Sequence, residues 1–237
     1  METKDTLFVI PARGGSKGIP RKNIKLLGQK PLIQYSIDYA RLFADDKNIC
    51  LSTDDSEIIA CASQLNLAVP FVRPAEFSSD TATTFSVLHH ALAHYQQANK
   101  QFKYLVLLQA TSPFRAKKHL EEAFQLIDNE TDVVVSVVKQ HNNPYFNLFE
   151  ETQSGFLKIS KGEGQFTRRQ DVPPVYAFNG SIYIFKVSAL VKAQTFKDFE
   201  HIKKYEMDEK YSIDLDTMQD WEYCEFLLAK RKDLTTF

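Results

Sequence analysis

The sequence predicts an α/β domain built on a mostly parallel, doubly wound β-sheet. Short runs of β-branched and aliphatic residues alternate with longer amphipathic runs, the pattern of successive strand–helix–strand units with right-handed crossovers. A glycine-rich segment follows the first strand run, at the position where open α/β sheets bind ligands. The 237 residues, 43% of them hydrophobic, fit a single domain spanning residues 1–237.

Strands and helices alternate through the first half of the chain. Leu7–Ile10 is an apolar run that predicts the first strand, and residues 11–31 are expected to form the loop after it. Tyr104–Leu108 is apolar throughout, as expected for a strand buried on both faces. The elements predicted between them are helix Leu32–Phe43, strand Ile49–Ser52, helix Asp55–Leu65, the short strand Val69–Val72 and helix Thr84–Ala98.

The second half continues this pattern on either side of an irregular segment. Residues 140–178 are rich in His, Asn, Pro, Gly and aromatic residues without periodicity, and they are too many for a plain loop. We therefore expect an inserted arm there. Thr217 and Asp220 have capping-box spacing for the last helix. The remaining predicted elements are helix Lys117–Ile127, strand Val133–Val138, strand Ser181–Phe185, a helix near Ala189–Ala193, the segment Ser212–Asp216 and helix Asp220–Lys232.

Composition and charge argue against several classes of protein. A net charge of −1 does not suit a general binder of nucleic acid or other polyanions. No stretch reaches the ~18 consecutive apolar residues of a membrane span, and no signal-peptide core follows the polar N-terminus. The cysteines Cys50, Cys61 and Cys224 are scattered in apolar surroundings, which predicts reduced thiols and a cytoplasmic protein.

The segment after the first strand carries an excess of positive charge. Residues 6–37 contain no Asp or Glu, although the rest of the chain mixes both signs. Gly14, Gly15 and Gly18 lack Cβ atoms, so backbone N–H groups there can approach an anion closely. Fixed cations and backbone amides together suit a triphosphate whose charge moves toward a diphosphate leaving group. The cations are Arg13, Lys17, Arg21, Lys22, Lys25 and Lys30.

Two widespread phosphate-binding loops do not match this segment. The Walker A pattern is absent, and Gly14–Gly18 lacks the G-x-G-x-x-G of dinucleotide-binding folds. Asp54 does follow the second strand, where a dehydrogenase has the acid that binds the ribose. A dehydrogenase, however, has no use for so many cations beside its diphosphate. We therefore interpret the loop as a nucleoside triphosphate site.

Two carboxylates near the C-terminus predict a metal site. Asp214 and Asp216 are two residues apart, so both side chains face the same way on an extended chain. Hard oxygen ligands of this kind, completed by phosphate oxygens and water, are what Mg²⁺ prefers. The alternative is that these acids only precede the last helix, where negative charge is favoured. Because the cationic loop predicts a triphosphate site, we favour the metal-binding interpretation of Asp214 and Asp216.

Six segments between Ile10 and about Leu228 form an ordered set of motifs. They are Ile10–Asn23 (IPARGGSKGIPRKN), Arg73–Thr81 (RPAEFSSDT), Leu108–Arg115 (LQATSPFR), Arg169–Pro173 (RQDVP), Asn179–Ile184 (NGSIYI) and Ser212–Asp216 (SIDLD). In this order they resemble the motifs of the acylneuraminate cytidylyltransferases, also called CMP-sialic acid synthetases. The resemblance implies a Rossmann-like nucleotidyltransferase fold with CTP and an acidic nine-carbon sugar as substrates.

The resemblance also implies a role for individual residues. Asp214 and Asp216 would bind Mg²⁺, and Gln109, Arg169 and Asn179 would contact the sugar. Within the nucleotide site, three cations would hold the phosphates, whereas Asn23, Arg73 and Thr84 would recognise the cytidine. The full nucleotide-binding set is Arg13, Gly14, Gly15, Ser16, Lys17, Lys22, Asn23, Arg73 and Thr84. The residues expected to take part in catalysis are Arg13, Lys17, Lys22 and Asp216.

The implied reaction needs no nucleophilic side chain. The anomeric hydroxyl of N-acetylneuraminate would attack the α-phosphorus of CTP in line and expel diphosphate, with positioning and charge neutralisation supplying most of the acceleration. Arginine binds carboxylates bidentately, so Arg169 suits the sugar carboxylate. Ala110 stands where the family usually has Pro, which removes no functional side chain. In the family the arm, here about residues 140–178, reaches the partner's active site, so a homodimer is expected.

Other interpretations remain open. The sugar could be another nonulosonic acid, pseudaminic, legionaminic or Kdo-like, because acyl groups are recognised by pocket shape. A different class is an inactive nucleotide-binding sensor, although the presence of both Asp214 and Asp216 argues against it. His90 and His94 have metal-ligand spacing, but the Glu of H-E-x-x-H is absent. Ser112 lacks the surrounding G-x-S-x-G pattern. We therefore assign no catalytic role to any of the three.

Overall fold

The computed structural model describes residues 3–79, 81–231 and 234. Its centre is a six-stranded sheet with the strand order β10-β6-β9-β5-β1-β4. β1 (Thr6–Pro11) lies between β4 (Ile49–Ser52) and β5 (Tyr104–Leu108), and both neighbours run parallel to it. β9 (Tyr176–Lys186) is antiparallel to both β5 and β6 (Val133–Lys139). The predicted α/β fold with a mostly parallel sheet is confirmed.

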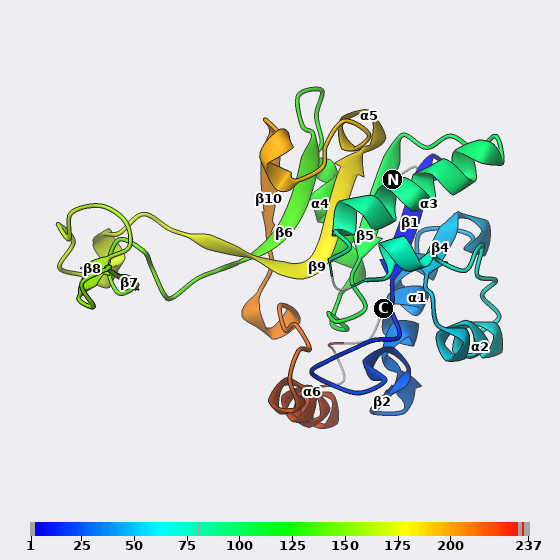
Figure 1. Cartoon of the computed structure of the whole chain (residues 1–237), viewed down its shortest axis with the longest axis horizontal. Coiled ribbons are helices and arrows are strands. Elements are labelled where there is room, and N and C mark those ends of the chain that lie inside the picture. Colours follow the sequence, from blue (N-terminus) through cyan, green and yellow to red (C-terminus); the bar gives the residue numbers. More distant parts are fainter. Residues whose placement is uncertain (1–2, 80, 232–233, 235–237) are drawn as a thin grey trace.

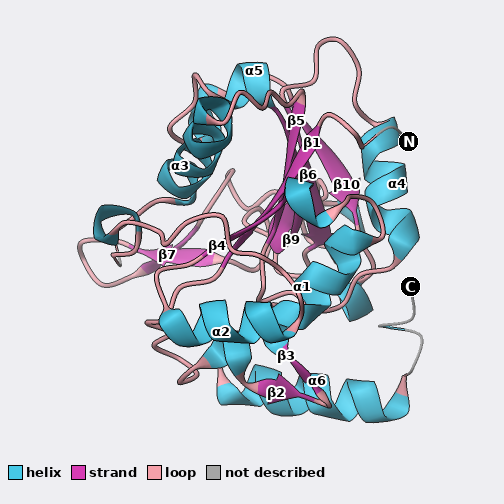
Figure 2. Cartoon of the chain, turned by 90° about the vertical axis from the view of Figure 1, so that its right-hand side faces the viewer, coloured by secondary structure: helices cyan, strands magenta, loops and turns pink. Residues whose placement is uncertain are grey.

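Helices cover both faces of the sheet. They are α1 (Leu32–Arg41), α2 (Ser56–Gln64), α3 (Thr84–Gln97), α4 (Lys117–Gln125), α5 (Val187–Leu190) and α6 (Met218–Lys230). Phe8 and Ile10 of β1 belong to one core with α1, α2, α4 and α6, whereas Leu7 and Val9 belong to a second core with α3 and α5. Figure 2 shows α3 and α5 across the sheet from α4. Because β1 is packed on both faces, it holds the loop after it firmly.

The segment between β6 and β9 forms an arm that extends away from the sheet (Figure 1). Its end carries a short antiparallel hairpin of β7 (Phe149–Glu151) and β8 (Leu157–Ile159). Large apolar side chains on this hairpin face solvent, and Phe156 and Leu157 are 74% and 71% exposed. A role of the arm in dimerisation stays a prediction.

Two sheet elements differ from the sequence-based expectation. The predicted strand Val69–Val72 is wrong, because Pro70 interrupts it and only Val72 forms an isolated parallel bridge, to Thr53. β10 (Ile202–Glu206) was not predicted. It is an edge strand parallel to β6, and its charged, largely exposed residues give no apolar run to detect.

The loop expected after β1, residues 11–31, also contains local structure. β2 (Leu26–Leu27) and β3 (Lys30–Pro31) form a two-residue hairpin, and η1 (Lys22–Ile24) is a single 3₁₀ turn. Thr217 caps α6 and exchanges hydrogen bonds with Asp220, which confirms the capping box. The predicted end of this helix at Lys232 lies outside the described residues. No helix within the described residues is both long and apolar enough to cross a membrane.

Candidate active site

A cavity of about 330 Å³ opens at the carboxyl end of β1, where the sequence predicts a ligand site. Its wall includes the loop after β1, the segment after β5 and Asp216. The lining residues are Pro11, Arg13, Ser16, Lys17, Gly18, Lys22, Asn23, Thr84, Gln109, Ala110, Thr111 and Asp216. A second hollow of about 250 Å³ shares Pro11, Arg13 and Thr84 with this cavity and adds Arg73. The two hollows therefore adjoin along Arg13 and Thr84.

Close backbone packing explains two of the three glycines in the loop. A Cβ atom on Gly18 would lie 2.1 Å from the carbonyl oxygen of Asp216, and one on Gly14 would lie 2.2 Å from Oδ2 of Asp55. Neither distance leaves room for a side chain. A Cβ atom on Gly15 would meet nothing within 4 Å. The loop after β1 is thus in close contact with the acidic segment at Gly18 and with the β4–α2 turn at Gly14.

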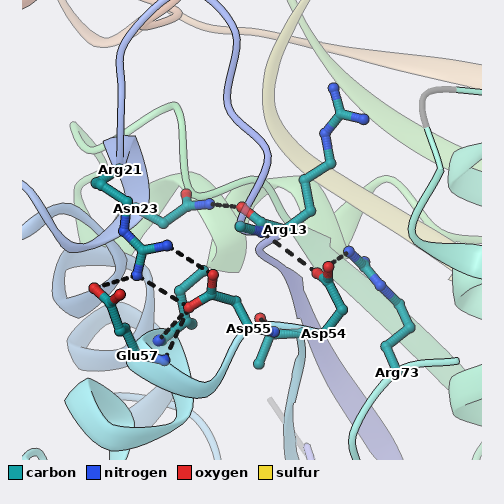
Figure 3. Close-up of polar contacts among 10 residues, drawn as sticks. Arg13, Arg21, Asn23, Asp54, Asp55, Glu57 and Arg73 are labelled. Atoms are coloured by element: carbon teal, nitrogen blue, oxygen red, sulfur yellow. Dashed lines mark hydrogen bonds and ion pairs between the residues drawn. The ribbon is translucent and has the colours of Figure 1, made fainter. Parts of the chain in front are cut away.

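Asp55 anchors the loop to the start of α2 (Figure 3). Its carboxylate accepts hydrogen bonds from the backbone N–H groups of Glu57 and Ile58, at 2.9 and 3.0 Å, which cap the helix. It also accepts from Nη1 of Arg21 at 2.8 Å, and Arg21 additionally pairs with Glu57. Partial burial acts to raise the pKa of Asp55, but the Arg21 and backbone hydrogen bonds outweigh it and hold the pKa below its usual value. Arg21 therefore fixes the loop in place.

Lys22 and Asn23 connect the loop to the rest of the cavity. The Lys22 ammonium donates to the carbonyl oxygen of Leu215 and lies 3.3 Å from Oδ1 of Asp216. The buried Asn23 amide donates to the backbone carbonyl of Arg13 at 2.9 Å. The cationic loop and the acidic segment are thus in direct contact across the cavity.

Arg73 lies at the wall of the smaller hollow and is only 4% exposed. Its Nε donates to Oγ of Ser78 at 3.0 Å, and its Nη2 donates to Oδ1 of Asp54 at 3.4 Å. Burial lowers the pKa of Arg73, Asp54 acts to raise it, and the neighbouring positive charge of Arg13 lowers it further. Two arginines therefore face the same hollow.

The segment after β5 places Gln109 in the cavity. Arg115, which is completely buried, donates from Nη2 to the carbonyl oxygens of Gln109 at 2.7 Å and Ser181 at 2.9 Å. Its Nη1 donates to Oγ of Ser36 at 3.0 Å. These bonds tie the end of β5 and the middle of β9 to α1, so the backbone beside Gln109 is held despite Ala110 at the position where Pro was expected.

The two carboxylates expected to bind Mg²⁺ lie close enough to interact. Partial burial raises the pKa of the Asp214 carboxyl, the nearby Thr111 hydroxyl opposes this shift, and the charge of Asp216 reinforces it. Oδ2 of Asp214 lies 3.3 Å from the position that a Cβ on Gly180 would occupy. Asp216 lines the cavity and Asp214 does not, but together the two carboxylates offer oxygen donors that fit a divalent cation. Among the described residues, no cluster of three or more His, Cys, Asp and Glu side chains has metal-binding geometry.

Two residues predicted to contact the sugar are not among the residues that line the cavity in this chain. The Asn179 side chain is 4% exposed; its Oδ1 accepts from Oγ of Ser136 at 2.6 Å and its Nδ2 donates to Oγ of Ser212 at 3.0 Å. It is therefore engaged in a buried network beneath the cavity. Arg169 is exposed on the arm and does not line the cavity of its own chain. Sugar contacts by both residues stay predictions.

The structure adds residues that sequence reasoning passed over. Thr111 lines the cavity and its hydroxyl lowers the pKa of Asp214, although its motif position gave no separate signal. Asp55 accepts a hydrogen bond from the loop after β1, and so does Asp54, which the sequence suggested only as a possible ribose-binding acid. The rings of His90 and His94 pack against Phe71, with centroids 4.6 and 4.8 Å apart.

These features define a class of protein. A cationic, glycine-rich loop at the carboxyl end of the first strand, faced by two carboxylates, suits transfer of a nucleotidyl group from a nucleoside triphosphate. Comparison with known proteins gives the family. The chain belongs to the cytidylyltransferase family, whose model matches residues 7–234, and it is accordingly a nucleotidyltransferase.

Curated relatives cover nearly the whole chain. The post-translational flagellin modification protein B of Campylobacter coli is 38% identical over 96% of each chain. The CMP-N,N'-diacetyllegionaminic acid synthase of Campylobacter jejuni is 34% identical over 95% of each. The N-acylneuraminate cytidylyltransferase of Streptococcus agalactiae serotype V is 35% identical over 91% of this chain, which spans about half (51%) of that protein. The chain is thus similar to enzymes named for different sugars.

A solved structure supports the fold. A CMP:2-keto-3-deoxy-manno-octonic acid synthetase complexed with CTP matches 95% of this chain and 98% of its own, with a TM-score of 0.68. At 16% identity this likeness shows the fold alone. It agrees with the Rossmann-like nucleotidyltransferase architecture expected from the sequence.

Proposed function

We propose that the protein joins CTP to a nonulosonic acid, an acidic nine-carbon sugar, to give the CMP-sugar and diphosphate. N-acetylneuraminate is our first candidate for the sugar. The observation that carries the proposal is the shared cavity, in which Lys22 of the cationic loop lies 3.3 Å from Asp216 of the carboxylate pair. The names of the relatives from Campylobacter and Streptococcus support the sugar class.

The two adjoining hollows suit the two parts of CTP. Arg13, Lys17 and Lys22 line the larger cavity, where they would hold the triphosphate by charge-assisted hydrogen bonds. Arg73 and Thr84 line the smaller hollow, where they would face the cytidine. Since the hollows share Arg13 and Thr84, a single nucleotide can extend from one to the other.

Asp214 and Asp216 would hold Mg²⁺. The metal would neutralise charge on the phosphates when bound. The chain's own residues would position the reactants: Gln109 would contact the sugar, and the cations of the loop would stabilise the charge that moves onto diphosphate. As the anomeric oxygen bonds to the α-phosphorus and the bond to diphosphate breaks, Asp216 would accept the hydroxyl proton.

We further propose that the active protein is a homodimer. The arm extends away from its own sheet and exposes Phe156 and Leu157, which a second copy of the chain would cover (Figure 1). Arg169 is on the same arm, so its guanidinium would bind the sugar carboxylate in the partner's cavity.

The test is diphosphate release by purified protein with CTP and Mg²⁺. N-acetylneuraminate, legionaminic, pseudaminic and Kdo-type acids would be compared by kcat/KM. We expect at least one nine-carbon acid to stimulate release and N-acetylneuraminate to be used best. Preference for another nine-carbon acid would change the assigned sugar. If no nonulosonic acid stimulates release, the proposed substrate class is wrong.

A further inference from the structure

Asp54 contacts two parts of the site at once. It follows β4 through Thr53, and its Oδ1 accepts from the Gly14 backbone N–H and from Nη2 of Arg73, both at 3.4 Å (Figure 3). Gly14 belongs to the loop that we assign to the triphosphate, and Arg73 to the hollow that we assign to the cytidine. One carboxylate oxygen therefore joins the phosphate side of the site to the base side.

The charge balance at this point explains why a carboxylate stands there. Arg73 is almost completely buried, and burial of a guanidinium is unfavourable unless a negative group or several acceptors compensate it. Arg13 adds a second positive charge at the same hollow. Ser78 offers only a neutral hydroxyl, whereas Asp54 forms the ion pair with Arg73. The Asp54 carboxylate therefore offsets part of the repulsion between the two arginines.

The neighbouring Asp55 has a separate task. Asp55 caps α2 and binds Arg21, so it secures the fold of this turn. The backbone of Arg73 is also held independently, because its N–H donates to the carbonyl of Thr53 at 2.8 Å. The Asp54 side chain remains 32% exposed and caps no helix. Its contacts thus control where the Arg73 guanidinium points rather than whether β4 and α2 form.

We propose that Asp54 is a positioning residue for nucleotide selection. It holds the Arg73 guanidinium and the Gly14 amide in one fixed arrangement, so that the base-recognising arginine and the phosphate loop meet CTP together. In dinucleotide-binding folds the acid after the second strand binds the ribose directly. Here the same topological position acts through an arginine. The inference rests on the proposed role of Arg73 in recognising cytidine.

The test uses Asp54→Asn, which keeps the shape of the side chain and removes its charge. We expect KM for CTP to rise about tenfold, with KM for the sugar unchanged and kcat within about twofold. The preference for CTP over UTP, measured as the ratio of kcat/KM values, should fall by a similar factor. Asp54→Ala should show the larger effect. The matched control is Asp45→Asn, an exposed carboxylate before the same strand, which should leave all three constants unchanged.

A double variant separates positioning from general damage. If Asp54 acts through Arg73, the preference for CTP over UTP should fall no further in the double variant Asp54→Asn/Arg73→Lys than in Arg73→Lys alone. The inference would be overturned if the losses of this preference in the two single variants multiplied in the double variant. An unchanged KM for CTP in Asp54→Asn would also overturn it. A selective loss of discrimination against 2′-deoxy-CTP would also overturn it, because it would mean direct ribose contact. If Arg73→Lys itself leaves CTP binding unchanged, the assigned role of Arg73 is wrong instead.

Discussion

At the scale of single residues, the site depends on glycine backbone atoms that lie too close to neighbouring residues for a side chain to fit between them. Gly18 touches the backbone of Asp216, and this contact joins the cationic loop to the acidic segment. The sequence indicated that glycines here serve close approach to an anion. The structure shows that Gly14 and Gly18 are also required by the protein's own packing. That second requirement depends on Asp55 for Gly14 and on the distant Asp216 for Gly18, so no local pattern reveals it.

Gly18→Ala is therefore expected to displace Asp216 relative to Lys22. We expect kcat/KM for CTP to fall about 100-fold, since a displacement of about 1 Å at a reacting centre has costs of this order. Gly15→Ala adds the same methyl group where no atom lies within 4 Å, and its loss should be about tenfold or less. Steady-state kinetics of both variants provide the comparison. Equal losses would show that the Gly18–Asp216 contact has no special role.

Asn179 shows that a motif position alone does not establish what a side chain contacts. Its place in a motif predicts a sugar contact, which stays a prediction, and in the structure its amide hydrogen-bonds Ser136 and Ser212. Sequence similarity assigns a position to a site and cannot distinguish a side chain that touches the ligand from one that supports the wall. Hydrogen-bonding capacity and burial make that distinction.

At the scale of elements, hydrophobic periodicity located the elements that are buried. The helices and the four strands β1, β4, β5 and β6 followed from their apolar patterns, because each packs against a core. The edge strand β10 has no such pattern, and β9 is longer than its apolar centre suggested. Elements defined by pairing or exposure rather than by burial were therefore the ones missed.

The start of α4 provides a prediction about stability. His119 is buried, its Nδ1 accepts the Ala116 backbone N–H at 3.1 Å, and its ring lies 4.5 Å from that of Tyr211. Burial lowers the pKa of His119 to about 4, and the neighbouring Lys118 contributes. The unfolded chain binds this proton more readily, so the contribution is complete above the unfolded pKa of 6.5 and is lost as pH falls toward 4.

His119→Gln is expected to remove most of this pH dependence. Glutamine at this helix position can also accept the Ala116 N–H, which preserves the capping interaction. Between pH 7 and pH 4 the wild-type protein should lose as much as about 3 kcal/mol more unfolding free energy than the variant. Urea unfolding across this range measures the difference. Parallel pH profiles would show that His119 is protonated equally in both states.

At the scale of the whole molecule, the arm sets the protein apart from a plain α/β domain. The sequence located it by its lack of periodicity, but its extension away from the sheet could not be deduced from composition. It also separates Arg169 from the cavity of its own chain. In our proposal each site is completed by the partner subunit.

Mixed dimers test this arrangement. One chain would carry Asp216→Ala and the other Arg169→Ala, each inactive alone. Coexpression should restore about one quarter of wild-type activity, because half of the dimers are mixed and each has one intact site. No restoration despite confirmed mixed dimers would place Arg169 at the site of its own chain. A monomer in light scattering, at the 27.2 kDa of one chain, would contradict the dimer itself.

The most direct test of the account is a crystal structure with CTP and Mg²⁺. We predict the triphosphate between Arg13, Lys17 and Lys22 on one side and the metal on Asp214 and Asp216 on the other, with the base beside Arg73 and Thr84. A triphosphate bound away from the loop after β1, or a metal that touches neither carboxylate, would contradict it.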